Sequence, residues 1–239
     1  HRAPLRDRRA GLGLSGRMNA AQSPVFLQHN RIRLALHTLR AGEGKSLLLL
    51  HGLGERSPAM VPMELSEWPG PVYALDFTGH GQSTIPTSGG YTCELLMADV
   101  DTALIRLQHA TLVGRGLGAY VALLIAGSRP ERVRGAILRD GPGLAGGGAS
   151  FNSPYIPYVD PQRAAPPDPY ALIELATDVR PQDYASGFAR QAAQFSGLSQ
   201  PLMVCARERP PWLAAVMSEL DLETCTLHQA LSWYADSEP

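Results

Sequence analysis

Three short glycine-containing runs hold most of the residues that could bind or activate a ligand. They are His51-Gly52-Leu53-Gly54, the run from Asp76 to Ser83, and Gly114-Arg115-Gly116-Leu117-Gly118, and each accompanies a short apolar segment. Arg115 is the one cation in the third run, and its planar guanidinium pairs well with a carboxylate or an anionic ligand. The sequence leaves two partners open for Arg115: a bound anion, or an acid of the chain such as Asp140.

A fourth run, Gly44-Lys45-Ser46, has the residue types that end a phosphate-binding loop. Such a loop needs a glycine five positions before Gly44, where this chain has Leu39. It also needs a helix directly after it, because the helix N-terminus binds the phosphate. An apolar, strand-like segment follows instead, so the sequence excludes a phosphate-binding loop here.

Alternating strand-like and helix-like segments must position these runs. A predicted hairpin comes first, and short apolar segments typical of buried parallel strands follow it: residues 25–28 and 32–36 for the hairpin, then 46–50, 72–76, 111–113, 136–138, 202–205 and 224–227. Helices are predicted between them, over residues 91–108, 118–128, 170–178 and 182–195. The alternation predicts an α/β fold, with a doubly wound, mostly parallel sheet of about eight strands.

One interval, residues 141–200, is too long for a plain crossover between strands. It begins with glycines, continues through a proline-rich stretch and ends in the two last predicted helices. We therefore expect residues 143–200 to form a small lid inserted over the carboxyl ends of the strands. Residues 1–20 are arginine-rich without the apolar core of a secretory signal, so we expect a disordered extension before a single domain over residues 21–239.

The order of these motifs resembles that of the α/β-hydrolase superfamily. Leu47 to Gly54 is similar to the family's strand and His-Gly loop, and Asp76 to Ser83 is similar to its D-x-x-G-x-G-x-S turn. Leu112 to Ala119 is similar to the strand, nucleophile elbow and helix that normally read G-x-S-x-G. The resemblance covers residues 25–228 and implies an α/β-hydrolase fold in which Gly116 stands where the catalytic serine would be.

The resemblance also implies where an oxyanion hole would lie. Its donors would be the backbone N–H groups of Leu53 and Leu117, with His51, Gly52 and Arg115 lining the pocket beside them. Backbone donors do not depend on side-chain identity, so they would outlast the loss of the serine.

The acid and base positions of the family are matched less well. The loop after the seventh strand, where the family usually has an aspartate, holds only Glu208 between two arginines. Asp140 follows the sixth strand, where some members place the acid, but an aspartate before Gly141-Pro142 is also an ordinary turn residue. His228 is the one candidate for the base, and its alternative is a half-exposed histidine of an edge strand.

Two functions are compatible with these matches. The first is a pseudo-hydrolase or impaired hydrolase that binds a small apolar ligand with a carbonyl or carboxylate group, since Gly116 cannot act as a nucleophile. The second is an active lyase, isomerase or hydrolase in which Asp140 and His228 form a general-base pair. A hydrogen bond between those two side chains would favour the second. A conventional esterase would need another nucleophile, and Ser150, Ser153 and Tyr155 are not at an elbow.

Composition limits the partners. A net charge of −1 gives no bulk attraction to nucleic acid or an anionic membrane, and no apolar run reaches the length of a membrane span. The three cysteines lack metal-type spacing, so we expect neither a metal nor a cofactor and favour a reducing cytoplasm. A single lysine among 21 cationic residues hints at a bacterial source, and the sequence leaves a homo-oligomer open.

Overall fold

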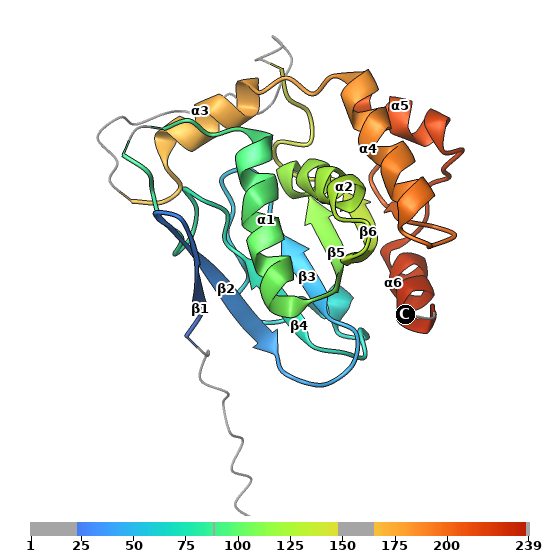
Figure 1. The fold of residues 1–239 in the computed structure, drawn as a ribbon, viewed down its shortest axis with the longest axis horizontal. Coiled ribbons are helices and arrows are strands. Elements are labelled where there is room, and N and C mark those ends of the chain that lie inside the picture. Colours follow the sequence, from blue (N-terminus) through green and yellow to red (C-terminus); the bar gives the residue numbers. More distant parts are fainter. Residues whose placement is uncertain (1–22, 88, 148–164, 238–239) are drawn as a thin grey trace, which may run out of the picture.

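The protein is described by a computed structural model that covers residues 23–87, 89–147 and 165–237. Its strands form one sheet in the order β1-β2-β4-β3-β5-β6-β7 (Figure 1). The strands are β1 (Val25–His29), β2 (Ile32–Arg40), β3 (Leu47–Leu50), β4 (Val72–Leu75), β5 (Ala110–Arg115), β6 (Val133–Arg139) and β7 (Leu202–Val204). The helices are the short 3-10 turn η1 (Met63–Leu65) and α1 (Cys93–Leu107), α2 (Leu117–Ser128), α3 (Pro169–Thr177), α4 (Gln182–Phe195), α5 (Pro211–Glu219) and α6 (Leu227–Asp236).

The sheet is mostly parallel, which confirms the predicted α/β class. β3 pairs in parallel with β4 and β5, and β6 pairs in parallel with β5 and β7. The antiparallel pairs are the predicted hairpin of β1 and β2 around Asn30 and the pairing of β2 with β4 at the edge of the parallel part. Asn30 takes a φ of +53°, which the hairpin turn requires and asparagine tolerates.

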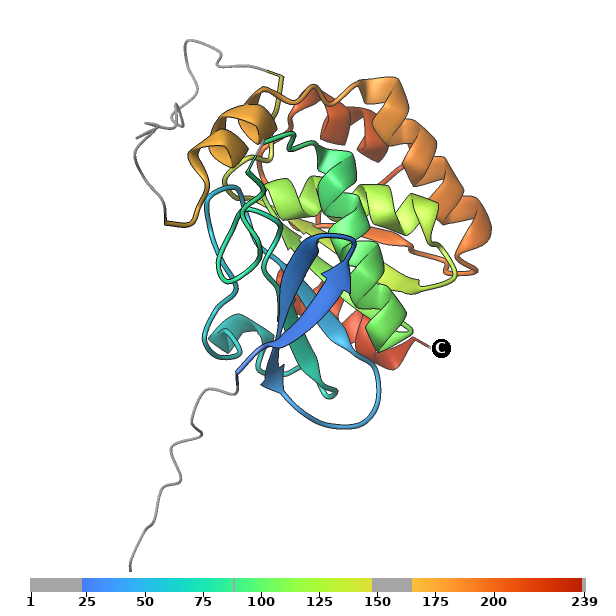
Figure 2. The same cartoon turned by 60° about the vertical axis from the view of Figure 1, so that its left-hand side comes forward.

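Both faces of the sheet are covered. Successive side chains of a strand point to opposite faces, so a fully apolar strand needs packing partners on both. In β3, Leu48 and Leu50 belong to the core on the side of α1 and α2, whereas Leu47 and Leu49 belong to a second core with α6. Figures 1 and 2 show α1 and α2 over one face of the sheet and α6 beyond the other. The two cores make the doubly wound arrangement that the sequence predicts.

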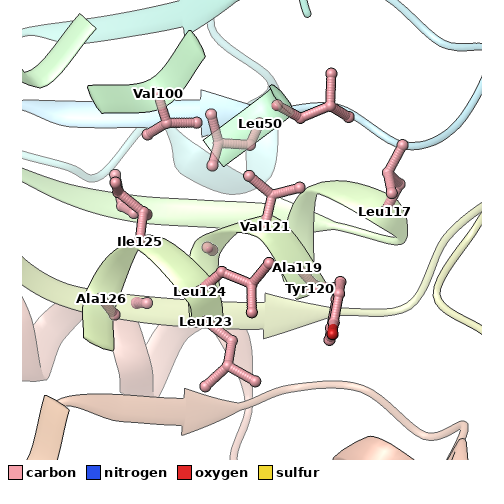
Figure 3. Packing of buried hydrophobic residues seen from close by; sticks show 14 of the residues in the cluster. Leu50, Val100, Leu117, Ala119, Tyr120, Val121, Leu123, Leu124, Ile125 and Ala126 are labelled. Atoms are coloured by element: carbon pink, nitrogen blue, oxygen red, sulfur yellow. The ribbon is translucent and has the colours of Figure 1, made fainter. Parts of the chain in front are cut away.

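Helix α2 is buried along almost its whole length, from Leu117 to Gly127. A helix that is apolar on every side must be surrounded by protein. Here α1, α4, β5 and β6 pack around it, and Gly127 lets the α4 backbone at Phe188 approach closely. Figure 3 shows the buried side chains of α2 packed together with Leu50 and Val100. The first turn of α2 is therefore held rigidly at the carboxyl end of β5.

The predicted strand over residues 224–227 is wrong. Only one isolated bridge, from Thr224 to Val204, joins this segment to β7, so the described residues form seven strands. Thr226 instead begins α6: its side chain accepts the Gln229 N–H, and the Gln229 side chain accepts the Thr226 N–H. This reciprocal capping box stabilises a helix start and outweighs the strand preference of the β-branched threonines.

The proposed lid is covered only in part. Residues 148–164, with Ser150, Ser153 and Tyr155, lie outside the described residues, as do residues 1–22. The predicted helices α3 and α4 are present, and α4 packs along α2 and α5 in the layer over the sheet (Figure 1). A lid over residues 143–200 therefore stays a prediction. Among the described helices, none is long and apolar enough to cross a membrane.

Candidate functional site

The loops after β3, β5 and β6 meet at one edge of the sheet, because these three strands are neighbours and run in parallel. In open α/β sheets, ligands bind beyond this carboxyl edge, where the strand order reverses. The runs at residues 51–54 and 114–118 therefore come together here. A third segment, residues 141–144 after β6, joins them and is named the Pro142 loop below.

Gly116 forms the expected sharp turn between β5 and α2. It is the N-cap of α2 with a φ of +59° and a ψ of −119°, a backbone conformation that favours glycine. The flanking glycines permit close packing: a Cβ at Gly114 would lie 2.3 Å from the Gly118 carbonyl oxygen, and one at Gly118 would lie 2.3 Å from the Leu50 carbonyl oxygen. The strand, elbow and helix are thus assembled as in an active hydrolase, but without a nucleophilic side chain.

The two expected oxyanion-hole donors converge on one oxygen atom. The N–H groups of Leu53 and Leu117 both donate to the Pro142 carbonyl oxygen, each over 2.9 Å. These are distances at which such donors would bind the oxygen of a substrate. The chain's own backbone therefore supplies the acceptor for both N–H groups.

The same carbonyl fills the space above Gly116. A Cβ on this residue would lie 2.1 Å from the Pro142 oxygen and 2.5 Å from the Gly141 carbonyl carbon. Both are backbone atoms, which cannot rotate away as a flexible side chain could. A serine at position 116 is incompatible with this position of the Pro142 loop.

The Pro142 loop is fixed from behind by two buried side chains. The Arg180 guanidinium donates to the carbonyl oxygens of Gly143 and Leu144, the latter over 2.6 Å. The Trp212 indole N–H donates to the Leu144 oxygen over 2.8 Å. Arg180 also lies over the ring of Tyr120, 5.0 Å from its centroid. Segments far apart in the sequence thus hold the loop against the N–H groups of Leu53 and Leu117.

Arg115 has an acid of the chain as its partner. Its Nε lies 3.1 Å from both carboxylate oxygens of Glu55, and one terminal nitrogen donates to the Asp140 backbone oxygen over 3.2 Å. Glu55 in turn accepts the Gly52 N–H over 3.0 Å. Of the two partners left open by the sequence, the structure shows the ion pair, which links the elbow to the His-Gly loop.

The buried histidines His51 and His80 hold backbone rather than a ligand. His51 accepts the Phe77 N–H at Nε2 and contacts the Gly52 oxygen through Nδ1 over 2.8 Å. His80 accepts the Gly54 N–H at Nε2 over 3.1 Å. Burial lowers the pKa of both imidazoles, that of His80 to about 3, where the nearby His51 ring adds to the effect. Both rings are therefore neutral structural elements near neutral pH.

Asp76, which opens the turn after β4, also shapes backbone. Its carboxylate accepts the Ser57 N–H over 2.8 Å and the Gln82 N–H over 2.9 Å, and it contacts the His37 ring over 2.8 Å. Burial raises the pKa of this carboxyl, but the hydrogen bonds from His37, Gln82 and Ser57 outweigh it and hold the pKa well below its usual range.

Asp140 and His228 are engaged by other groups. The Asp140 carboxylate accepts the N–H groups of Arg207 (2.8 Å) and Glu208 (3.0 Å), and so holds the loop after β7. His228 lies in the first turn of α6, with its side chain 71% exposed and its Nδ1 2.8 Å from a Glu67 carboxylate oxygen. No hydrogen bond joins Asp140 to His228 in the part of the chain that the structure describes, and no group of three or more acids, histidines or cysteines there could hold a metal ion.

Comparison with known proteins decides the family. The model of the alpha/beta hydrolase family matches residues 47–236, which is most of the chain. The chain belongs to the alpha/beta hydrolase family. Among solved structures, Est1E of Butyrivibrio proteoclasticus with ferulic acid bound is 12% identical, with 89% of this chain and 96% of that chain covered at a TM-score of 0.60. The hypothetical protein PA1622 of Pseudomonas aeruginosa is 20% identical, with coverages of 90% and 97% and a TM-score of 0.59. Both are similar to this chain in fold.

Curated relatives of this hydrolase-family chain match it over less than half its length. The (E)-2-((N-methylformamido)methylene)succinate hydrolase of Acinetobacter baylyi is 31% identical over 114 residues, covering 45% of this chain and 41% of that protein. The pimeloyl-[acyl-carrier protein] methyl ester esterase of Shewanella woodyi is 33% identical over 104 residues, covering 43% and 38%. The chain thus spans about two fifths of the length of these relatives.

Two residues of the site were absent from the sequence-based hypothesis. Pro142 supplies the oxygen that accepts the N–H groups of Leu53 and Leu117, and Arg180 holds its loop in place. Gly141-Pro142-Gly143 marks a turn in the sequence, but a turn signal does not reveal which groups its carbonyls meet.

Proposed function

We propose that this chain is a pseudo-hydrolase, a member of the α/β-hydrolase family that does not carry out acyl transfer through an elbow serine. The observation that carries the proposal is the Pro142 carbonyl oxygen, which accepts both oxyanion-hole N–H groups and occupies the space above Gly116. A nucleophile and an oxyanion hole are the two parts that serine hydrolysis needs at this edge. This chain has no nucleophile at Gly116, and the Pro142 oxygen already accepts the two N–H groups of the proposed oxyanion hole.

For a ligand to bind at this edge, its oxygen would have to replace the Pro142 oxygen as the acceptor of the two N–H groups. A small apolar molecule with a carbonyl or carboxylate oxygen is the ligand class that two convergent N–H groups recognise. Such a ligand would have to displace the Pro142 carbonyl, and therefore to compete with the contacts of Arg180 and Trp212 that hold the loop.

The alternative enzyme, based on a general-base pair, gains no support from the hydrogen bonds of its two residues. The Asp140 carboxylate binds the backbone of Arg207 and Glu208, and His228 pairs with Glu67 on the surface. A base that removes a proton from substrate must have its free nitrogen or oxygen within hydrogen-bond reach of that proton. We therefore rank the pseudo-hydrolase first.

The test measures release of p-nitrophenol from p-nitrophenyl acetate together with labelling by a fluorophosphonate probe. We expect the wild type to show no burst of product and no labelled serine, because a Gly116 elbow has no nucleophile. Gly116→Ser is expected to restore neither signal, since the Pro142 loop excludes the side chain. A wild-type burst, or a labelled serine found by peptide mapping, would contradict the proposal.

A further inference from the structure

Two cysteines lie side by side at the free edge of the sheet, away from the elbow. Cys205 directly follows β7, and Cys225 directly precedes the cap of α6. Their sulfur atoms are 3.4 Å apart. The Cys225 N–H donates to the Val204 carbonyl oxygen over 2.9 Å, and Thr224 pairs with Val204. Backbone pairing beside the two cysteines therefore fixes their register, so the contact between the thiols does not depend on side-chain conformation alone.

Both cysteines are half-buried, but only one of them lines the surface hollow beside them. Cys225 lines a surface hollow of about 600 Å³ whose other walls include Leu222, Gln229 and Trp233. Cys205 does not line this hollow, and burial, followed by its contact with the Cys225 thiol, raises its pKa to about 12. A small reagent in the hollow would reach Cys225 first.

We propose that Cys205 and Cys225 are a modification site that forms a reversible disulfide with a small-molecule disulfide, such as oxidised glutathione, as the oxidant. Cys225, as thiolate, attacks one sulfur of the reagent; the reagent's S–S bond breaks and one reduced thiol leaves with the proton. Cys205 then loses its proton, attacks the Cys225 sulfur of the mixed disulfide and expels the second reduced thiol. Two cysteine thiols are oxidised and one reagent disulfide is reduced to two thiols.

Little movement is needed for the second step. Bonded sulfur atoms lie about 2.05 Å apart, so rotation about the two Cα–Cβ bonds has to close only the remaining gap. The bond would enclose residues 206–224, which contain α5. Because Trp212 of α5 donates to the Leu144 oxygen, the disulfide would also fix one support of the Pro142 loop.

The experiment exposes the folded full chain to oxidised glutathione at mildly alkaline pH and follows thiols and intact mass with time. We expect the three thiols to fall to one, with the mass lowered by two hydrogens and peptide mapping that joins Cys205 to Cys225. Closing a loop of this size restricts the unfolded chain, so the midpoint of thermal unfolding should rise by roughly 5–10 °C and return on reduction.

Three cysteine variants separate the outcomes. Cys93→Ser, which removes the buried third thiol, should still form the bond, because Cys93 lies in α1. Cys205→Ser should stop at a glutathione adduct on Cys225, and Cys225→Ser should react at least about tenfold more slowly, since the remaining thiol at this edge is the less accessible one. A wild-type adduct on Cys225 that persists beside a free Cys205, or a bond that forms only in urea, would overturn the proposal.

Discussion

One atom, the Pro142 carbonyl oxygen, accepts the N–H groups of Leu53 and Leu117 and also occupies the space above Gly116. In an active hydrolase, the nucleophile occupies the space at the elbow, and an oxygen of the substrate accepts the two N–H groups. Glycine at position 116 thus has two physical reasons: its φ of +59° and the backbone that lies where a Cβ would stand. The absence of a side chain at position 116 is tied to the position of the Pro142 loop.

Gly116→Ala should therefore lower the free energy of unfolding by about 3–5 kcal/mol, from the disfavoured φ together with the steric clash. Gly44→Ala is a matched control, because Gly44 has a φ of +95° and a Cβ there would meet no other part of the chain within 4 Å. That variant should lose only about 1–2 kcal/mol. Urea unfolding of both variants tests the comparison; equal losses would show that the Pro142 carbonyl does not restrict position 116.

A second single residue, His80, makes the free energy of unfolding depend on pH. Burial lowers its pKa from 6.5 to about 3 in the folded protein, while the unfolded chain has the ordinary value. Between these values the unfolded state binds more protons than the folded state, so this histidine makes the free energy of unfolding fall as the pH falls from 6.5 towards 3.

In NMR spectra, the His80 ring should therefore remain neutral at about pH 5. The variant His80→Gln should show a shallower loss of stability over the same pH range than the wild type, because this contribution is removed. Protonation of His80 near pH 6.5 in the folded protein would contradict its role as an acceptor for the Gly54 N–H.

Among the elements, α6 shows how a local signal competes with a strand-like pattern. Residues 224–227 have the alternation and the β-branched residues of a strand, yet Thr226 and Gln229 form a capping box and the helix begins. The first turn of this helix carries His228 to the surface beside Glu67.

Thr226→Val distinguishes helix start from strand in this segment. Valine keeps the β-branched shape but cannot accept the Gln229 N–H, so the loss of the cap should cost about 1 kcal/mol of folding stability. Thr226→Ser keeps the acceptor and should stay within about 0.5 kcal/mol of the wild type. Thermal unfolding measures both. A neutral or stabilising valine would indicate that the segment behaves as a strand.

At the scale of the whole molecule, the segments that close the site are far apart in the sequence. The donors follow β3 and β5, the acceptor follows β6, and the supports Arg180 and Trp212 come from the turn before α4 and from α5. Arg180 is almost fully buried, and both terminal nitrogens of its guanidinium donate to main-chain oxygens. The contact of the Pro142 oxygen with the N–H groups of Leu53 and Leu117 is therefore a property of the tertiary structure as a whole.

Arg180→Met should loosen the Pro142 loop without replacing Leu53, Leu117 or Pro142. We expect hydrogen exchange at the Leu53 and Leu117 amides to become at least about tenfold faster, because charge-assisted hydrogen bonds that hold the loop are lost. Arg190→Met is the control, since Arg190 is 56% exposed and pairs with Glu219 on the surface. Unchanged exchange at both amides in Arg180→Met would mean that the loop is held without Arg180.

Much of the fold could be predicted from the sequence, because it follows from local patterns. The apolar segments from Val25 to Val204 became strands, and the glycines at 114, 116 and 118 became the elbow, since each depends on periodicity or on backbone freedom. The turn at Asp76 forms around its carboxylate, and the N–H groups of Leu53 and Leu117 meet at the Pro142 oxygen. Their role as oxyanion-hole donors stays a prediction. The partner of Arg115 could not be chosen, because Glu55 is 60 residues away and meets it only across adjacent strand ends.

By itself, the sequence determined the α/β-hydrolase fold and the absence of a serine at the elbow, since both are written in short runs of residues. Only the tertiary structure decided what fills the space above Gly116. A carbonyl oxygen exists at every residue, so its presence carries no sequence signal; its role depends on which donors the folded chain brings within reach. Here the parallel order β3-β5-β6 brings the Pro142 oxygen to the N–H groups of Leu53 and Leu117.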